Sequence, residues 1–264
     1  MNYTANTIMR DGYCLHYCAL TDPGCRRTHN EDAFLVDEEG LMFAVADGVG
    51  GLGGGEIASN MALAEFSSCF NTFRSKLCTP STRLRRAIER ANTAVFRHGH
   101  EHGKRIATTL SLMILQGQQA FIANVGDSRV YLWRHKRLRQ LTTDHTVRQE
   151  MMENGLLSGN TPGPPGIDHL ITRAVGAEEQ VNADITPFSV EPGDSYLVCS
   201  DGVTSMLSDE EIQHVLGSMA SPVQAGKVLV ENAKAAGGND NITLILFTVN
   251  QPEAGGKMVT ADWS

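Results

Sequence analysis

The chain has 264 residues, of which 41% are apolar and 20% charged, and this balance is typical of a globular protein and excludes a disordered or fibrous one. Its formal net charge is −8, and basic residues gather mainly in 83–97 and 134–139, so general nucleic-acid binding is not expected. No apolar run approaches the roughly 20 residues of a membrane span. Residues 1–20 lack a basic start followed by an apolar core, so we expect no membrane association and a cytoplasmic protein.

The first half of the chain alternates short strand-like runs with two helical blocks. Turn residues separate the strand-like runs, while apolar residues three and four positions apart predict amphipathic helices. The predicted strands are 14–21, 33–37, 41–46, 108–115, 119–125 and 128–134, and the predicted helices are 57–74 and 81–98. The last three strands, joined by Gly-containing turns, form a predicted β-meander.

The second half adds a surface flap, further strands and two helices. Residues 158–167 contain three prolines and three glycines, too many for regular structure, and they fall within a flap expected over about 146–173. The predicted helices are 146–154, 209–216 and 222–235, and the predicted strands are 195–200 and 242–249. We expect one domain over residues 1–250 and a C-terminal tail over 251–264, with no internal repeat.

Five short acidic motifs run along the chain, most of them at the polar end of an apolar run. They are Asn30-Glu31-Asp32, Asp47-Gly48-Val49-Gly50-Gly51, Gly126-Asp127-Ser128-Arg129, Ser200-Asp201-Gly202-Val203 and Asn239-Asp240-Asn241-Ile242. Buried charges must be paired or bound to metal, and carboxylate oxygens are the ligands that Mg²⁺ and Mn²⁺ prefer. The motifs therefore predict a metal site built from distant parts of the sequence.

The order of these motifs, together with Arg27-Thr28-His29 before the first and Thr243 after the last, resembles the metal-dependent type 2C protein phosphatases, and their bacterial branch above all. The resemblance covers about residues 14 to 249. It implies an α+β fold, a four-layer α-β-β-α sandwich in which antiparallel helix pairs flank two central antiparallel sheets. The short strands and paired helices expected above are consistent with that architecture.

The resemblance also implies which groups bind metal. Asp47 would lie between two Mn²⁺ or Mg²⁺ ions, with Glu31 and the carbonyl of Gly48 on one side and Asp201 and Asp240 on the other. A turn that presents its own carbonyl to an ion needs close backbone approach, and glycine permits this.

Three further positions carry over from the resemblance. Asp127 would hold a third, weaker ion together with Asp201, although a carboxylate that only caps its own turn is the alternative. Asp32 would support the catalytic reaction by orienting metal-bound water. Arg27 would bind the substrate phosphate, because a planar guanidinium can grip two phosphate oxygens, and Arg26 is its rival if the register shifts by one residue.

The implied activity is that of a protein-serine/threonine phosphatase, in which a metal-activated water attacks phosphoserine or phosphothreonine directly. The expected partners are phosphorylated proteins, a Ser/Thr kinase or its targets, and the protein is expected to be a monomer. Two alternatives stay open: a metal-dependent hydrolase of small phosphoesters, and a non-catalytic phosphoprotein-binding relative.

The source of the proton for the leaving group is open. Many eukaryotic relatives carry histidine after the Asp-Gly pair, where this chain has Val49. His145, His29 and a metal-bound water are the candidates.

Two other motifs receive simpler interpretations. The run His98-Gly99-His100-Glu101-His102 is expected to be a solvated loop after a helix, and not a second metal site. The glycine-rich run 50–55 is followed by no Gly-Lys-Ser or Gly-Lys-Thr, so it does not predict a nucleotide-binding loop.

Overall fold

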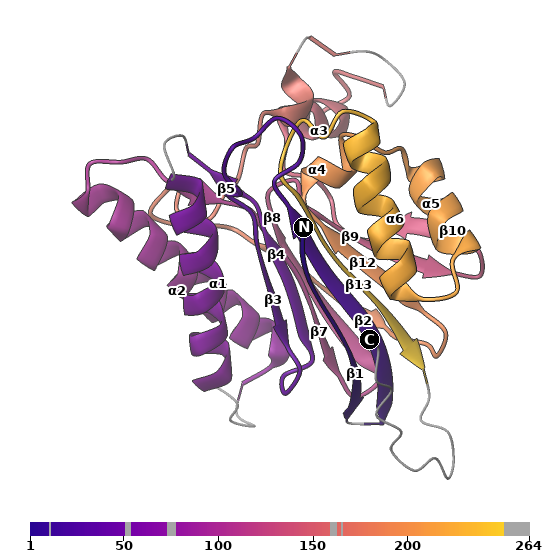
Figure 1. Ribbon diagram of the computed structural model, residues 1–264. Coiled ribbons are helices and arrows are strands. Elements are labelled where there is room, and N and C mark those ends of the chain that lie inside the picture. The colour runs from indigo at the N-terminus through magenta and orange to yellow at the C-terminus, as the bar shows by residue number, and fades with distance from the viewer. Residues whose placement is uncertain (11, 51–53, 73–77, 159–162, 165, 251–264) are drawn as a thin grey trace.

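Two antiparallel sheets lie face to face at the centre of the molecule, and helices cover their outer faces (Figure 1). The structure is a computed structural model, and it describes residues 1–10, 12–50, 54–72, 78–158, 163–164 and 166–250. The predicted tail, 251–264, lies outside the described residues. No helix within those ranges is long and apolar enough to cross a membrane.

The larger sheet has six strands in the order β1-β2-β13-β12-β9-β10. These strands are Asn2–Arg10, Tyr13–Asp22, Ile242–Asn250, Ser195–Cys199, Arg129–Arg134 and Arg137–Gln140. The second sheet has five strands in the order β11-β8-β7-β4-β3, which are Asp184–Ser189, Gln119–Val125, Leu110–Gln116, Met42–Ala46 and Ala33–Asp37. A small two-stranded sheet pairs β5 (Gly48–Val49) with β6 (Ala107–Thr108).

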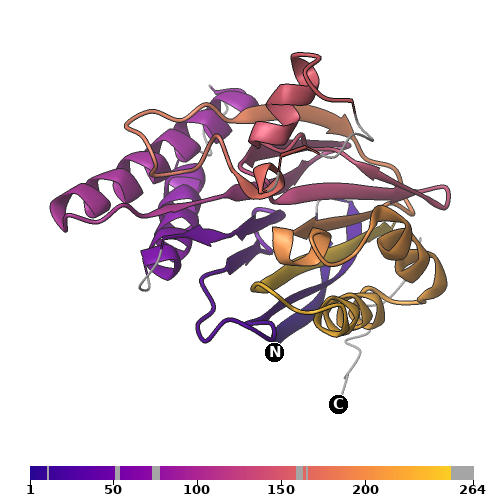
Figure 2. The same cartoon turned by 90° about the horizontal axis from the view of Figure 1, so that it is seen from above.

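Helices α1 (Gly54–Thr72) and α2 (Pro80–Glu101) pack on the five-stranded sheet, and α5 (Asp209–Ser218) and α6 (Pro222–Ala235) pack on the six-stranded sheet (Figure 2). Each pair buries one apolar stripe, as an amphipathic helix does. Sequence-local caps set their starts: the Thr79 side chain accepts the Thr82 amide before α2, and Ser208 and Glu211 form a capping box at α5.

Three apolar cores correspond to the three interfaces of a four-layer sandwich. One lies between α1, α2 and the five-stranded sheet, one lies between the two sheets, and one lies between the six-stranded sheet and α5 and α6. In the middle core the Phe43 and Phe247 rings stack with centroids 4.0 Å apart, and Tyr196 stacks on Phe247 from 5.3 Å. The predicted α+β sandwich with flanking helix pairs is therefore confirmed.

Some predicted elements need correction. The expected strand 108–115 is divided at Thr109, which leaves the strand to bond with Asp47, and Ser200 caps the short helix α4 (Asp201–Thr204) instead of ending a strand. The His98–His102 run is not a loop: α2 continues to Glu101, and the His98 and His102 rings stack 4.3 Å apart.

Three strands of the two large sheets were not predicted, and all three lie at sheet edges. β1 and β10 are rich in polar and charged residues, and β11 contains Pro187, which is tolerated in a strand only at an edge or bulge. An edge strand has one neighbour and little buried surface, so it lacks the alternating pattern that identifies a strand in sequence.

The flap forms one end of the molecule. It begins with α3 (Val147–Glu153) and contains a 3₁₀ turn, η1 (Ile167–His169), and Thr146 bridges to Ile171. Residues 159–162 and 165 of the predicted irregular stretch lie outside the described part. Figure 1 shows α3 and α4 at the same end of the sandwich, where the acidic motifs follow or precede their strands.

We expect Phe43→Ala to lower the free energy of unfolding by about 3–5 kcal/mol, because the lost ring leaves a cavity between the sheets. Urea unfolding followed by circular dichroism measures this. Tyr3→Ala is the control, since that ring is 58% exposed, and its free energy of unfolding should change by less than about 1 kcal/mol. Equal effects of the two substitutions would contradict the central place of Phe43.

Candidate metal centre and phosphate site

The acidic residues predicted from the motifs lie at the same end of the sandwich. Antiparallel pairing places the ends of some strands beside the beginnings of their neighbours. Ala46 pairs with Ala33, and Asp22 pairs with Ile242, so the loops after β4 and β2 meet the segments that enter β3 and β13. This arrangement brings together Glu31, Asp32, Asp47, Asp127, Asp201 and Asp240.

The backbone of Asp47 is fixed by the break between β6 and β7. Its N–H donates to Thr109 Oγ1 at 2.9 Å, and its carbonyl accepts from the Thr109 N–H and from Thr108 Oγ1, both at 2.8 Å. Thr108 and Thr109 are buried, so this turn is tied to the five-stranded sheet.

Gly48 and Gly55 approach each other so closely that no side chain fits between them. A Cβ on Gly48 would lie 2.3 Å from the Gly55 carbonyl oxygen and 2.5 Å from that of Glu31. A Cβ on Gly55 would lie 2.7 Å from the Gly48 carbonyl oxygen and 2.9 Å from Glu31 Cδ. The Gly48 carbonyl and the Glu31 carboxylate are thus close neighbours, as two ligands of one ion would be.

Asn241 joins the loop after β2 to the loop before β13. Its Oδ1 accepts the Glu31 N–H at 2.8 Å, and its Nδ2 donates to the carbonyls of His29 at 2.9 Å and Pro23 at 3.1 Å. The side chain is therefore fully used in holding the segment that carries Arg27 and Glu31.

Arg27 lies at the open side of this centre. Its Nη2 donates to Asp240 Oδ2 at 2.8 Å, and the two side chains are 51% and 34% exposed. The hydrogen bond and charge of Asp240 raise the pKa of Arg27, and the charges of Glu31 and Asp47 add to this effect. Arg26 is exposed, so between the two rivals the structure brings Arg27 to the acidic cluster.

Asp32 is buried and its Oδ2 accepts the Ser200 hydroxyl at 2.8 Å. Its other oxygen, Oδ1, is buried without a hydrogen-bond partner among the described residues, and the same holds for Oδ1 of Asp201. Unpartnered buried carboxylate oxygens are costly unless a cation meets them. These two atoms fit a divalent ion, and they point to the centre that the motifs predict.

The acids repel one another strongly. Burial, together with the charges of Asp32 and Asp201, raises the pKa of Asp47 well above its usual value. Burial also raises the pKa of Asp32 to about 7. Such shifts are expected where several carboxyl groups share one site without a compensating cation.

Asp127 belongs to the same cluster and is held by a buried histidine. Burial, with the charge of Asp201 second, raises the pKa of Asp127 to about 7. His145 Nδ1 accepts the Gly126 N–H at 3.1 Å, and the His145 N–H donates to the Gly126 carbonyl at 2.9 Å. His145 Nε2 lies 3.3 Å from Asp184 Oδ2 and 3.2 Å from Arg173 Nη1, so both ring nitrogens have polar neighbours.

The carboxylates are close but not yet arranged around an ion. In the described part of the chain, no three Asp, Glu, His or Cys side chains converge in a metal-holding group. Repulsion among like charges accounts for this spread, and one expected ligand, the Gly48 carbonyl, is a backbone group. The chemistry of the donor set, all hard oxygens, still fits Mg²⁺ or Mn²⁺.

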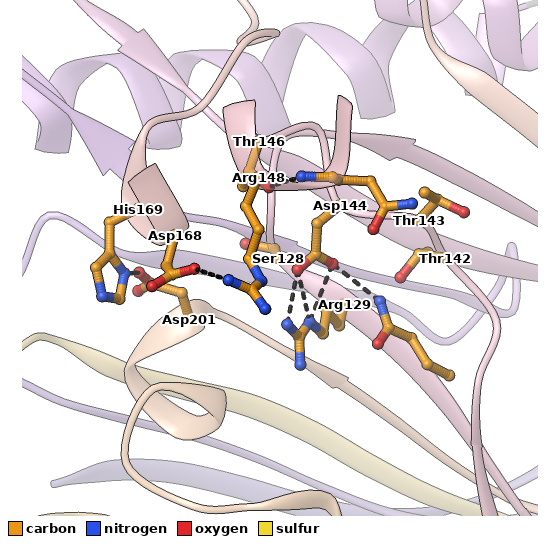
Figure 3. Close-up of polar contacts among 12 residues, drawn as sticks. Ser128, Arg129, Thr142, Thr143, Asp144, Thr146, Arg148, Asp168, His169 and Asp201 are labelled. Atoms are coloured by element: carbon orange, nitrogen blue, oxygen red, sulfur yellow. Dashed lines mark hydrogen bonds and ion pairs between the residues drawn. The ribbon is translucent and has the colours of Figure 1, made fainter. Parts of the chain in front are cut away.

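The flap adds a residue that sequence reasoning missed. His169 Nδ1 lies 3.9 Å from Asp201 Oδ2, and its neighbour Asp168 pairs with Arg148 of α3 at 3.2 Å (Figure 3). No spacing in the sequence marks His169, because only the return of the flap brings η1 to α4. His29, the other histidine considered, is exposed, and the structure shows its backbone carbonyl held by Asn241.

Comparisons with known proteins agree with this geometry. The pattern of the family described as Protein phosphatase 2C matches residues 25–233. The serine/threonine phosphatase stp of Listeria monocytogenes is 34% identical over 239 residues, which are 88% of this chain and 95% of that protein. Protein phosphatase PhpP of Streptococcus pneumoniae is 32% identical over 240 residues, which are 89% of this chain and 98% of PhpP.

Solved structures show the same similarity. The Mycobacterium tuberculosis serine/threonine phosphatase PstP/Ppp has a TM-score of 0.83 at 29% identity, covering 90% of this chain and 99% of that one. A PstP catalytic domain in complex with two manganese ions has a TM-score of 0.79 at 30% identity, again over 90% and 99%.

The chain belongs to the protein phosphatase 2C family. The predicted membership of the bacterial branch of the type 2C serine/threonine phosphatases is therefore confirmed.

We expect Asp47→Asn to stabilise the metal-free protein by about 1–2 kcal/mol, since the amide removes one charge from the cluster and can still donate to Asp201. The gain should increase as pH rises from about 5 to 8. A carboxyl whose pKa is raised by folding keeps its proton at low pH and costs stability only as pH rises through that pKa. Unfolding in chelator measures this, with Glu89→Gln on exposed α2 as the control; a variant less stable than the wild type at pH 8 would contradict the repulsion.

Proposed function

We propose that this phosphatase hydrolyses phosphoserine and phosphothreonine in proteins with the help of two divalent ions, Mn²⁺ or Mg²⁺. The unpartnered buried oxygen Asp201 Oδ1 carries the metal part of the proposal. When bound, such ions activate water and neutralise charge on the phosphate.

The positions of the oxygen-bearing groups indicate which residues would hold the ions. Glu31 and the Gly48 carbonyl, which adjoin each other at Gly55, serve one ion, and Asp201 and Asp240 serve the other. Asp47 lies between the two groups. Asp127, beside Asp201, is proposed to hold a third ion with it.

Two residues of the chain act on the substrate side of the reaction. Arg27, free to turn at the open side of the site, binds two phosphate oxygens and orients the phosphorus for in-line attack. Asp32, fixed through Oδ2 by the Ser200 hydroxyl, keeps Oδ1 available to orient the attacking water. The attack is direct, with no covalent phosphoenzyme.

The open position of Arg27 and Asp240 suits a phosphorylated side chain carried on a protein surface. We propose that the substrates are targets of a bacterial Ser/Thr kinase, or the kinase itself, and that the enzyme works as a monomer in the cytoplasm. A non-catalytic relative would be expected to lack metal carboxylates, yet Glu31, Asp47 and Asp201 are all present at the centre.

The first experiment measures phosphate release by the purified protein from phosphothreonine and phosphoserine peptides, with Mn²⁺, with Mg²⁺ and with chelator. We expect release with either ion and none with chelator. Free nucleotides and sugar phosphates are assayed beside the peptides. Faster turnover of these small esters would favour the small-phosphoester hydrolase, and no release from any substrate would contradict the proposed function.

We expect Arg27→Ala to raise KM for a phosphopeptide roughly tenfold or more, because a charged hydrogen bond to phosphate is lost. Mn²⁺ affinity, measured by calorimetry, should not fall, since Asp240 loses a competitor for the ion. Arg26→Ala is the matched control one residue away and should leave KM unchanged. An unchanged KM in Arg27→Ala, or an equal rise in Arg26→Ala, would move the phosphate role elsewhere.

A further inference from the structure

The β9–β10 hairpin carries a cluster of unpaired positive charge. Lys136, Arg137 and Arg139 are exposed, and none of them forms an ion pair with a described residue. Their neighbour Arg134, in contrast, forms ion pairs with Asp194 at 2.6 Å and with Glu191. In a protein of net charge −8, three uncompensated cations on one hairpin form a distinct electrostatic feature.

The hairpin holds these cations in a fixed position. Leu138 packs into the core below α5, and its N–H donates to Gln213 Oε1 at 3.0 Å. Side chains alternate across a strand, so Arg137 and Arg139 project from the opposite face. Arg139 lies 5.2 Å from the centre of the Phe188 ring, which gives it a cation–π contact on β11. β10 is the last strand of its sheet, so its outer edge faces no further strand.

A polar pocket continues from the end of β10 to the metal centre. Gln140, the last residue of β10, donates to Asp144 Oδ1 at 2.9 Å and lines this pocket of about 510 Å³ together with Thr142, Thr146 and Asp168. Beyond Asp168 lies His169, next to Asp201, as Figure 3 shows. The pocket therefore extends from Gln140, at the end of the hairpin, to Asp168, the residue before His169.

The pocket itself is electrically balanced. Arg129 is fixed by Asp144 through Nη2 at 2.7 Å, and Arg148 pairs with Asp168 at 3.2 Å. Hydroxyl and amide groups supply much of the remaining lining. The cations without an ion-pair partner, Lys136, Arg137 and Arg139, precede the lining residue Gln140 along the hairpin, outside the pocket.

We propose that Lys136, Arg137 and Arg139 form a docking surface for an acidic segment of the phosphoprotein substrate, whose phosphorylated residue reaches the metal centre along the pocket. This inference rests on the proposed function. Complementary charge on an interface rim raises the rate of encounter and fixes orientation. The exposed cations of α2 lie on the other side of the sandwich, so among these two groups the hairpin is the one on the side of the pocket, and an acidic segment bound there would approach from that direction.

The test uses the full chain in which all three cations become glutamine, Lys136→Gln/Arg137→Gln/Arg139→Gln. The matched control removes three exposed cations from α2, on the far side of the sandwich, as Arg85→Gln/Arg86→Gln/Arg97→Gln. Substrates are a phosphothreonine peptide with a run of glutamates on its N-terminal side, one with the run on its C-terminal side, the same peptide with glutamines, and p-nitrophenyl phosphate. Each is assayed with Mn²⁺ at low and high NaCl.

We expect the hairpin variant to raise KM about tenfold for at least one glutamate peptide, as the sum of three weak exposed interactions, with kcat unchanged. KM for the glutamine peptide and turnover of p-nitrophenyl phosphate should stay at wild-type values. High salt should weaken the preference of the wild type for glutamate and leave the variant unaffected. The α2 variant should behave as the wild type throughout.

Two results would overturn the docking surface: an unchanged KM for both glutamate peptides in the hairpin variant, or the same loss in the α2 variant. If the triple variant unfolds early, Arg137→Gln alone carries the same test, with about a twofold expected rise in KM. Failure of the proposed function is separate, because it would appear as absence of turnover by the wild type on every substrate, p-nitrophenyl phosphate included.

Discussion

Mutual repulsion among buried carboxylates is the constraint on which this structure depends. Asp32, Asp47 and Asp201 occupy one end of the sandwich, where their pKa values are raised chiefly by burial and then by one another. A protein can keep such a cluster only if the surrounding structure is stable enough to bear its cost, and if a ligand removes that cost in use. Divalent cations are the ligands with the charge and the preference for oxygen that this cluster requires.

The three apolar cores of the sandwich stabilise the fold and so offset the repulsion among the carboxylates. Asp201 begins the short helix α4 and the other acids stand on loops, but each lies within two residues of a strand, and hydrogen bonds from side chains fix the turns between them. Thr108 and Thr109 hold Asp47, Ser200 holds Asp32, and Asn241 ties the Arg27 segment to the entry of β13. Asp127 is positioned in the same way by His145. The site is therefore set by rigid elements, which is how a charged cluster can keep its geometry.

The side chains around the centre differ in exposure and in charge. Arg27 and Asp240 are exposed at the mouth, where a phosphate can enter, and the flap brings His169 beside Asp201. The pocket below the flap is neutral because each of its arginines has its own carboxylate. Positive charge without a partner lies farther out, on the β9–β10 hairpin. In the docking proposed above, this separation would let the centre treat phosphorylated side chains alike while the hairpin distinguishes between the proteins that carry them.

The sequence by itself determined the family, the two sheets with their helix pairs, and the acidic residues of the motifs. Apolar periodicity and five motifs in order can be read from the sequence alone, because they depend on residues that are near one another in the chain. It missed β1, β10 and β11, since edge strands bury too little to leave a pattern, and it placed a loop at His98–His102 where α2 continues. Only the tertiary structure brought Arg27 to Asp240, His145 to Gly126, and His169 to Asp201. Those contacts join residues 19 to 213 positions apart in the chain, and antiparallel pairing and burial determine such contacts where the spacing of residue types cannot.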